Sequence, residues 1–160
     1  LGLEESGEVY IKMNKKEYKK ALHCAIAATA SSAYVIARGH KLPKEISLPI
    51  VLDDSCEKIV KTAQAEKMFE AIGFADDLQR GKRVKGRSGI GSRKGGKKRA
   101  KSLLVVVHDI NSPIARAARN LAGVDVVSAS KLRVIDLAPG TKAGRLAAYT
   151  KSSLEQIGKL

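Results

Sequence analysis

Residues 103–107 constrain the fold more than any other part of the chain, because they form an unbroken apolar run that ends in three valines. Such a run is typical of a strand that is covered on both faces at the centre of a sheet. Helical and strand patterns alternate on both sides of it, and strands separated by helices require crossover connections. The sequence therefore predicts an α/β fold, a mostly parallel sheet with helices on both faces in a Rossmann-like arrangement.

The helices and strands expected around this run follow from apolar periodicity and from capping residues. Asn14 with Glu17 resembles a capping box, residues 53–55 can cap the next helix, and Pro113 suits the first turn of a third. The expected helices cover residues 14–39, 53–73, 112–123, 131–137 and 152–157, and the expected strands cover residues 49–52, 103–107, 124–127 and 145–150.

A chain of 160 residues with an apolar fraction of 44% is expected to form a single domain over residues 1–160. Residues 1–13 resemble a linker and Leu1 is not an initiator methionine, so we expect a fragment or a processed product. No run approaches the roughly 18 apolar residues that a membrane span needs, and the start lacks a signal pattern. We therefore expect a soluble, cytoplasmic protein without a membrane partner.

A basic, glycine-rich segment at residues 80–101, the arm, holds eleven Lys or Arg residues, six glycines and no acidic residue. The whole chain carries a net charge of +14, whereas the remainder, with 19 basic and 16 acidic residues, carries only +3. The arm has hardly any apolar side chain to bury, so we expect it to extend from the domain. Its cations are Arg80, Lys82, Arg83, Lys85, Arg87, Arg93, Lys94, Lys97, Lys98, Arg99 and Lys101.

Like charges at this density repel one another, so the arm needs an anionic partner, and RNA or DNA fits best. A loop longer than about 15 residues inside a domain is usually functional or disordered, which weakens the alternative of a merely solvated loop. The arm also lacks the aromatic or leucine side chains that insert into membranes. With no Trp, two Phe and four Tyr in the chain and none in the arm, bases have no stacking platform there. We expect recognition of nucleic-acid backbone and shape.

The alternative class is a Rossmann-like nucleotide- or nucleic-acid-processing enzyme. Residues 91–98 approach a Walker A motif, but Lys98 stands where Ser or Thr should hold magnesium, and the stretch leads into a strand rather than out of one. His108 and Asp109 follow the central strand, where open α/β sheets place active sites. No nucleophile, carboxylate pair or metal cluster accompanies them, so we favour a turn at the end of the strand over a catalytic site.

The cysteines and histidines do not indicate a metal site. Cys24 and Cys56 lack metal-ligand spacing and sit in apolar helical patterns, so we expect each to be a small buried hydrophobe. His23, His40 and His108 are scattered along the chain. We therefore expect no metal, no cofactor and no catalytic residue.

Several stretches resemble the archaeal and eukaryotic form of large-subunit ribosomal protein four. The arm and the stretch RNLAG at residues 119–123 are the most specific, and together the matches cover nearly the whole chain. The other matching stretches are ALHCAIAATA at 21–30, VIARGHKLP at 35–43, PIVLDD at 49–54, IVKTAQAEKMFEAIG at 59–73, SPIARAARNLAGVDVVSAS at 112–130 and DLAPG at 136–140.

The resemblance implies an α/β domain on the outside of the large ribosomal subunit that binds large-subunit ribosomal RNA, supports its assembly and touches neighbouring ribosomal proteins. Members of the family are not enzymes, so no small-molecule substrate is expected. An earlier section of the family, with a loop that reaches the exit tunnel, is expected to be lacking here. Gly95 and Gly96 depart from the family pattern, which usually has more arginine there. Beyond the arm, the RNA contacts implied by the resemblance are Arg116, Arg119, Asn120, Lys142 and Arg145.

Overall fold

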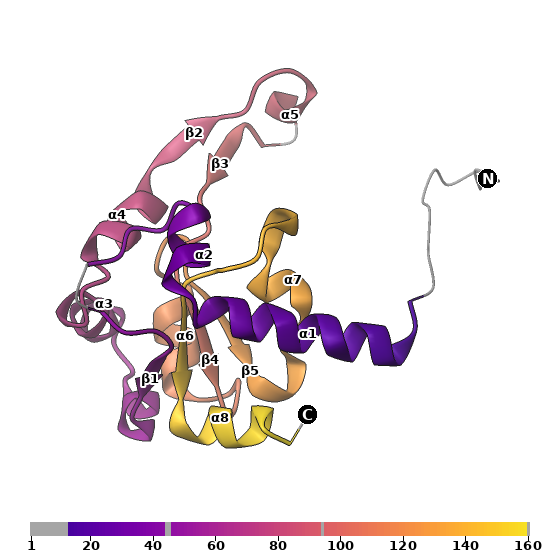
Figure 1. Cartoon of the computed structure of the whole chain (residues 1–160). Helices are drawn as coiled ribbons and strands as arrows, with labels where there is room; N and C mark the ends of the chain where they lie inside the picture. Colours follow the sequence, from indigo (N-terminus) through magenta and orange to yellow (C-terminus); the bar gives the residue numbers. More distant parts are fainter. Residues whose placement is uncertain (1–12, 44–45, 94, 160) are drawn as a thin grey trace.

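The computed structural model describes residues 13–43, 46–93 and 95–159, so most of the linker-like start lies outside the described residues. Figure 1 shows a layered body with one long projection. The helices are α1 (Lys15–Thr29), α2 (Ser32–Ala37), α3 (Thr62–Ala71), α4 (Ala75–Lys82), α5 (Ile90–Arg93), α6 (Pro113–Arg119), α7 (Val134–Leu137) and α8 (Lys151–Ile157). The strands are β1 (Ile50–Leu52), β2 (Val84–Gly86), β3 (Lys97–Arg99), β4 (Leu104–Val107), β5 (Asp125–Ser128) and β6 (Ala147–Thr150), and short 3₁₀ turns are η1 (Asp54–Lys58), η2 (Ala129–Lys131) and η3 (Pro139–Thr141).

The main sheet has four parallel strands in the order β1-β6-β4-β5. The apolar run at residues 103–107 contains β4, which pairs with β6 on one side and β5 on the other. Each residue of β4 is fully buried. The prediction of a mostly parallel sheet around a central buried strand is confirmed.

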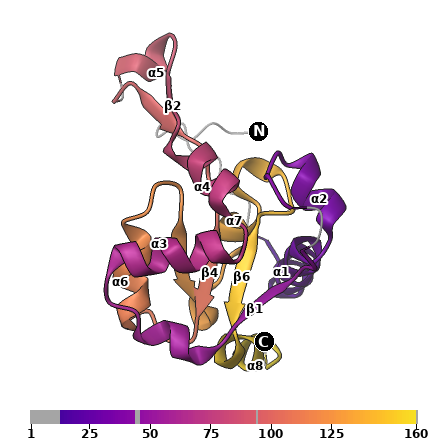
Figure 2. The ribbon, with the colours of Figure 1, turned by 90° about the vertical axis from the view of Figure 1, so that its left-hand side faces the viewer.

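Helices cover both faces of this sheet, as predicted (Figure 2). Consecutive strand residues point to opposite faces, and Val105 and Val107 pack in one apolar cluster while Leu104 and Val106 pack in another. Residues of α3, α4 and α6 complete the first cluster, and residues of α1, α7 and α8 complete the second. No helix in the described ranges is long and apolar enough to cross a membrane.

The arm leaves the body as an antiparallel hairpin of β2 and β3 with α5 at its far end (Figure 1). Its first leg continues directly from α4, and its second leg leads into the amino end of β4. The expectation of an extended segment is confirmed, although Arg80 to Lys82 belong to the last turn of α4 rather than to the hairpin.

The prediction of a single long helix over residues 14–39 is wrong, because the helix is interrupted at Ala30 and Ser31. Leu22 of α1 packs in the cluster on one face of the sheet, whereas Val35 of α2 packs in the cluster on the other. One straight helix cannot reach both faces, so the chain turns between them. The exposed Cys24 on α1 also contradicts the expected burial, while Cys56 is partly buried.

The helix expected to start at residues 53–55 begins later, at Thr62. Asp54 instead lies in η1 and caps a helix distant in sequence, since its carboxylate accepts hydrogen bonds from the backbone N–H and the hydroxyl of Ser152 at 3.1 and 2.6 Å. The first of these bonds satisfies a backbone N–H in the first turn of α8, and together they attach η1 to that helix. They also hold the pKa of Asp54 below its ordinary value.

Candidate nucleic-acid interface

The hairpin of the arm places positive side chains against one another. Lys85 on β2 stands directly opposite Lys98 on β3, and the neighbouring pairs are Val84 with Arg99 and Gly86 with Lys97. Every residue of both strands is exposed. Like charges directly opposite across two strands destabilise the pairing, so this hairpin gains stability from an anion that neutralises them.

The far end of the hairpin turns through α5. Gly89 and Gly95 adopt positive φ angles of 60° and 96°, a backbone conformation that side chains other than glycine rarely adopt. The backbone N–H of Arg87 donates to the carbonyl of Gly96 at 2.8 Å and closes the turn. Arg87 and Arg93 are exposed there, whereas Lys94 lies outside the described residues. The two glycines thus shape the turn that presents these cations.

Both legs of the arm are held at its base by one buried carboxylate, Asp77 on α4. Its oxygens accept hydrogen bonds from His40 Nδ1 (3.1 Å), Lys41 N (3.1 Å), Arg80 Nε (2.8 Å) and Ser102 Oγ (2.6 Å). Arg80 belongs to the first leg and Ser102 follows the second. Burial opposes ionisation, but the bonds from His40, Arg80 and Ser102 outweigh it and hold the pKa of Asp77 well below its usual range. The carboxylate therefore joins the legs to each other and to the body.

The hydrogen-bond pattern assigns the tautomer of His40. The backbone N–H of Leu146 donates to His40 Nε2 at 3.3 Å, so the ring proton sits on Nδ1 and is donated to Asp77. Arg80 Nη2 lies 3.0 Å from the same Nδ1, but two donors cannot bond each other. Arg80 is anchored instead by Asp77 and by the carbonyl of Lys101 at 2.7 Å. Its guanidinium links the two legs, so Arg80 is a residue that positions the arm.

Two glycines let the base of the arm pack against the loop after α6. A Cβ at Gly81 would lie 2.5 Å from the carbonyl oxygen of Ala122, and a Cβ at Gly123 would lie 2.7 Å from that of Ala100. Gly123 also has a positive φ of 83°. Gly81 is thus a residue that allows close packing at the base of the arm.

Arg145 lies beneath the arm rather than on the surface. Its side chain is only 1% exposed, and its guanidinium donates to Ser102 O (3.1 Å), Asp136 O (2.9 Å) and Asp125 Oδ2 (2.6 Å). Asp125 also accepts from Lys101 Nζ at 2.9 Å. Burial opposes ionisation of Asp125, yet these two cations lower its pKa. Arg145 therefore supports the second leg of the arm from inside the protein.

A cationic hollow of about 340 Å³ opens between the base of the arm and the loop that precedes β6. Sequence reasoning missed Arg38, whose guanidinium donates to the carbonyls of Lys142 and Pro139. Burial, followed by the nearby charges of Arg145 and Arg80, lowers the pKa of Arg38. More than 100 residues separate Arg38 from these partners, so no local pattern marks it. The hollow is lined by Arg38, His40, Arg80, Lys98, Arg99, Ala100, Lys101, Pro139, Gly140 and Lys142.

The structure gathers most of the other predicted contacts at the same end of the sheet. Since α6 runs back from the carboxyl end of β4 to the start of β5, its last residue, Arg119, and the following Asn120 lie near the amino ends of the strands, where the arm is rooted. Both are exposed, as is Arg116 one turn earlier. Lys82 is exposed but pairs with Glu66 at 2.6 Å. Arg83 is exposed beside it.

The opposite, carboxyl end of the sheet does not resemble an active site. Glu57 of η1 accepts hydrogen bonds from the backbone N–H of His108 (3.2 Å) and from Thr150 Oγ1 (3.0 Å), so it links the ends of β4 and β6. This is the position where the strand order reverses and where α/β sheets usually bind ligands. Residues 91–93 and 95–98 lie at the other end, in the arm. Within the described ranges, no three His, Cys, Asp or Glu side chains gather as a metal site.

Comparison with known proteins places this chain in a family. The family model described as "Ribosomal protein L4/L1 family" matches residues 2–160. The large ribosomal subunit protein uL4 of Pyrobaculum aerophilum is 44% identical over 152 residues, which cover 94% of this chain and 54% of that protein. The proteins of the same name from Saccharolobus solfataricus and Natronomonas pharaonis are each 46% identical, over 89% and 92% of this chain and 54% and 59% of their own lengths. The chain thus spans little more than half the length of these relatives. It belongs to the ribosomal protein L4/L1 family.

Proposed function

We propose that this chain is a structural constituent of the large ribosomal subunit that binds large-subunit ribosomal RNA and supports its assembly, beside neighbouring ribosomal proteins in the cytoplasm. The observation that carries the proposal is the hairpin, which sets Lys85 against Lys98 on two fully exposed strands. A dense anion favours such a pairing by neutralising both lysines, and folded RNA supplies closely spaced phosphates. The relatives' name, large ribosomal subunit protein, agrees with that partner.

The proposed contact surface has two parts. The hairpin presents its exposed cations to phosphates, and the amino end of the sheet adds Arg116, Arg119, Asn120 and Lys142. Arg38, Arg80 and Arg145 belong to this surface as supports, because their guanidinium groups are used in hydrogen bonds within the protein. The exposed cations of the arm proposed to meet phosphates are Lys82, Arg83, Lys85, Arg87, Arg93, Lys97, Lys98, Arg99 and Lys101, and Lys94 is proposed with them from the sequence alone.

The enzyme alternative gains no support from the structure or from the relatives. His108 donates its backbone N–H to Glu57, and its side chain is exposed at the end of β4 without a nucleophile partner among the described residues. The stretch that approaches a Walker A motif forms α5 and β3 of the arm instead of a loop between a strand and a helix of the main sheet.

The salt dependence of RNA binding tests the proposal. We would replace Arg93, Lys97, Lys98 and Arg99 with Ala and titrate the protein with a fragment of large-subunit ribosomal RNA at several salt concentrations. Each phosphate contact contributes about 0.7 to 0.9 to the log-log slope, so the slope should become shallower by about 3. The melting temperature should change little, because all four side chains are exposed.

The matched control removes four exposed lysines from the body, Lys58, Lys61, Lys67 and Lys159. It lowers the net charge by the same amount without touching the arm. The control variant should keep nearly the whole slope of the unmodified chain. Equal slopes for the two variants would show that net charge, rather than the hairpin, determines binding, and the proposal would fail.

A further inference from the structure

The last strand of the main sheet, β5, has a free edge. In the parallel pairing with β4, Asp125 donates its backbone N–H to Leu103 O at 3.1 Å, so Asp125 and Val127 face β4. The backbone N–H and C=O groups of Val126 and Ser128 consequently point away from the sheet, and the two residues are 8% and 4% exposed. β5 ends the strand order, and no described strand pairs with this side of it. An edge of this kind is a template for a further strand.

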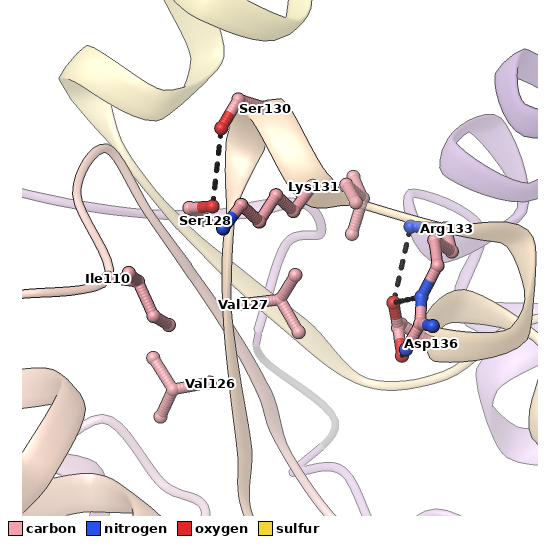
Figure 3. A pocket seen from close by; sticks show the side chains of 9 residues that line it. Ile110, Val126, Val127, Ser128, Ser130, Lys131, Arg133 and Asp136 are labelled. Atoms are coloured by element: carbon pink, nitrogen blue, oxygen red, sulfur yellow. Dashed lines mark hydrogen bonds and ion pairs between the residues drawn. The ribbon is translucent and has the colours of Figure 1, made fainter.

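A hollow of about 490 Å³ runs along that edge (Figure 3). It is lined by the three consecutive residues Val126, Val127 and Ser128. Because consecutive strand residues point to opposite faces, a hollow that touches all three lies alongside the strand rather than over either face. Ile110, which lies beside Val126 (Figure 3), and Leu132 give it apolar walls. The space therefore matches an extended segment with apolar side chains at alternate positions.

Positive charge flanks this hollow. Lys131 extends across the end of β5 toward Ser128 (Figure 3), and its side chain has no hydrogen-bond partner within the described residues. Arg133 pairs with Asp136 at 3.2 Å, and Asp109, next to Ile110, accepts the backbone N–H of Asn111 at 3.0 Å. Four exposed lysines occupy the first two turns of α1, which packs on α7: Lys15, Lys16, Lys19 and Lys20.

We propose that the free edge of β5 binds an extended, acidic segment of another protein by strand addition. The outward N–H and C=O groups of Val126 pair with the backbone of the segment, its apolar side chains enter the hollow, and one carboxylate meets Lys131. Unpaired backbone groups and apolar walls match a peptide strand, whereas an RNA backbone has neither peptide groups to pair with the edge nor apolar side chains to fill the hollow. The site lies at the carboxyl end of β5, the opposite end of the sheet from the arm, so it is separate from the proposed RNA contacts.

Amide hydrogen exchange, followed by NMR on the ¹⁵N-labelled chain, tests this inference. The probe is the peptide acetyl-Thr-Val-Glu-Val-Glu-Val-Thr-amide, compared with a counterpart in which Lys replaces Glu. The glutamate peptide should slow exchange at the amides of Val126 and Ser128. Lys131→Glu should weaken its binding about fivefold at low salt, as expected for reversal of one exposed ion pair. Lys131→Arg keeps the charge and should bind normally.

Lys67→Glu on α3 is the matched control, because it makes the same change in charge on an exposed residue away from the edge. It should leave peptide binding unchanged, and Lys131→Glu should leave RNA binding unchanged. The inference is overturned by unaltered exchange at Val126 and Ser128, by equal binding of the lysine peptide, or by equal losses in the two charge-reversal variants. It is also overturned if an RNA oligonucleotide, and not the peptide, protects these amides.

Discussion

Replacement of Asp77 with Ala should destabilise the protein and loosen the arm. The carboxylate is fully buried and accepts bonds from His40, Lys41, Arg80 and Ser102, which lose their shared acceptor together. Removing one partner of a buried charge pair costs about 3 to 5 kcal/mol, since the other charge stays buried without compensation. The charge of Arg80 is partly solvated, with 22% of its side chain exposed, so we expect the lower part of that range.

Urea unfolding at neutral pH measures this loss, with Asp76→Ala as the control because Asp76 is the exposed neighbour on the same helix. Asp77→Asn, which keeps the size and one acceptor oxygen, should lose less than Asp77→Ala. Amide exchange should accelerate in both legs of the arm when Asp77 is replaced. A loss below about 1 kcal/mol, the size expected for one ordinary hydrogen bond, would refute the role of Asp77 as the shared anchor.

The same substitution has a pH signature. The folded state lowers the pKa of Asp77, so the carboxylate stabilises the fold fully above its unfolded pKa near 3.8. This contribution is lost as the pH falls below that value towards the folded pKa. The free energies of unfolding of the unmodified chain and of Asp77→Ala should therefore differ most at neutral pH and converge in acid. A constant difference down to the lowest accessible pH would contradict the assignment.

Two further substitutions test the packing of the arm and of the core. Gly81→Ala should cost about 1 to 3 kcal/mol in urea unfolding, because its Cβ would lie 2.5 Å from Ala122 O, whereas Gly86→Ala in the hairpin meets nothing within 4 Å and should cost less than half as much. Tyr149→Phe should cost about 1 kcal/mol through loss of the buried 2.8 Å bond with Thr29. Because burial raises the pKa of Tyr149 above 10.0, the fold is stabilised below pH 10 and loses that contribution as the pH rises further; the Phe variant should lack this alkaline loss.

The sequence predicted the elements that depend on local apolar pattern. The run that became β4 is buried on both faces, and such a run has few alternatives in a folded domain. Pro113 and the small-residue stripe after it likewise predicted α6. Residues that act through distant partners were not predictable in the same way. Asp54 caps α8 across 98 residues, and nothing in its own neighbourhood reveals Ser152.

The residues of the candidate site also divide into those that the local sequence predicts and those that depend on distant partners. Charge density alone located the arm, since repulsion among its cations is a property of sequence. Which cations are free and which are internal supports depends on the carboxylates that the fold brings close. The family resemblance implied that Arg145 is an RNA contact, but its side chain is buried and bound to Asp125. Arg38 is a second internal support, because the chain folds back and brings the carbonyl of Lys142 beside it.

The central claim is that the hairpin of the arm attaches this domain to ribosomal RNA. The test is a competition between the unmodified chain and a variant in which a two-residue Asn-Gly turn replaces residues 84–99, which removes both strands of the hairpin. The measurement is the amount of each chain taken up by assembling large subunits. The unmodified chain should displace the variant almost completely, while both should unfold at nearly the same urea concentration. Equal uptake of the two chains would contradict it.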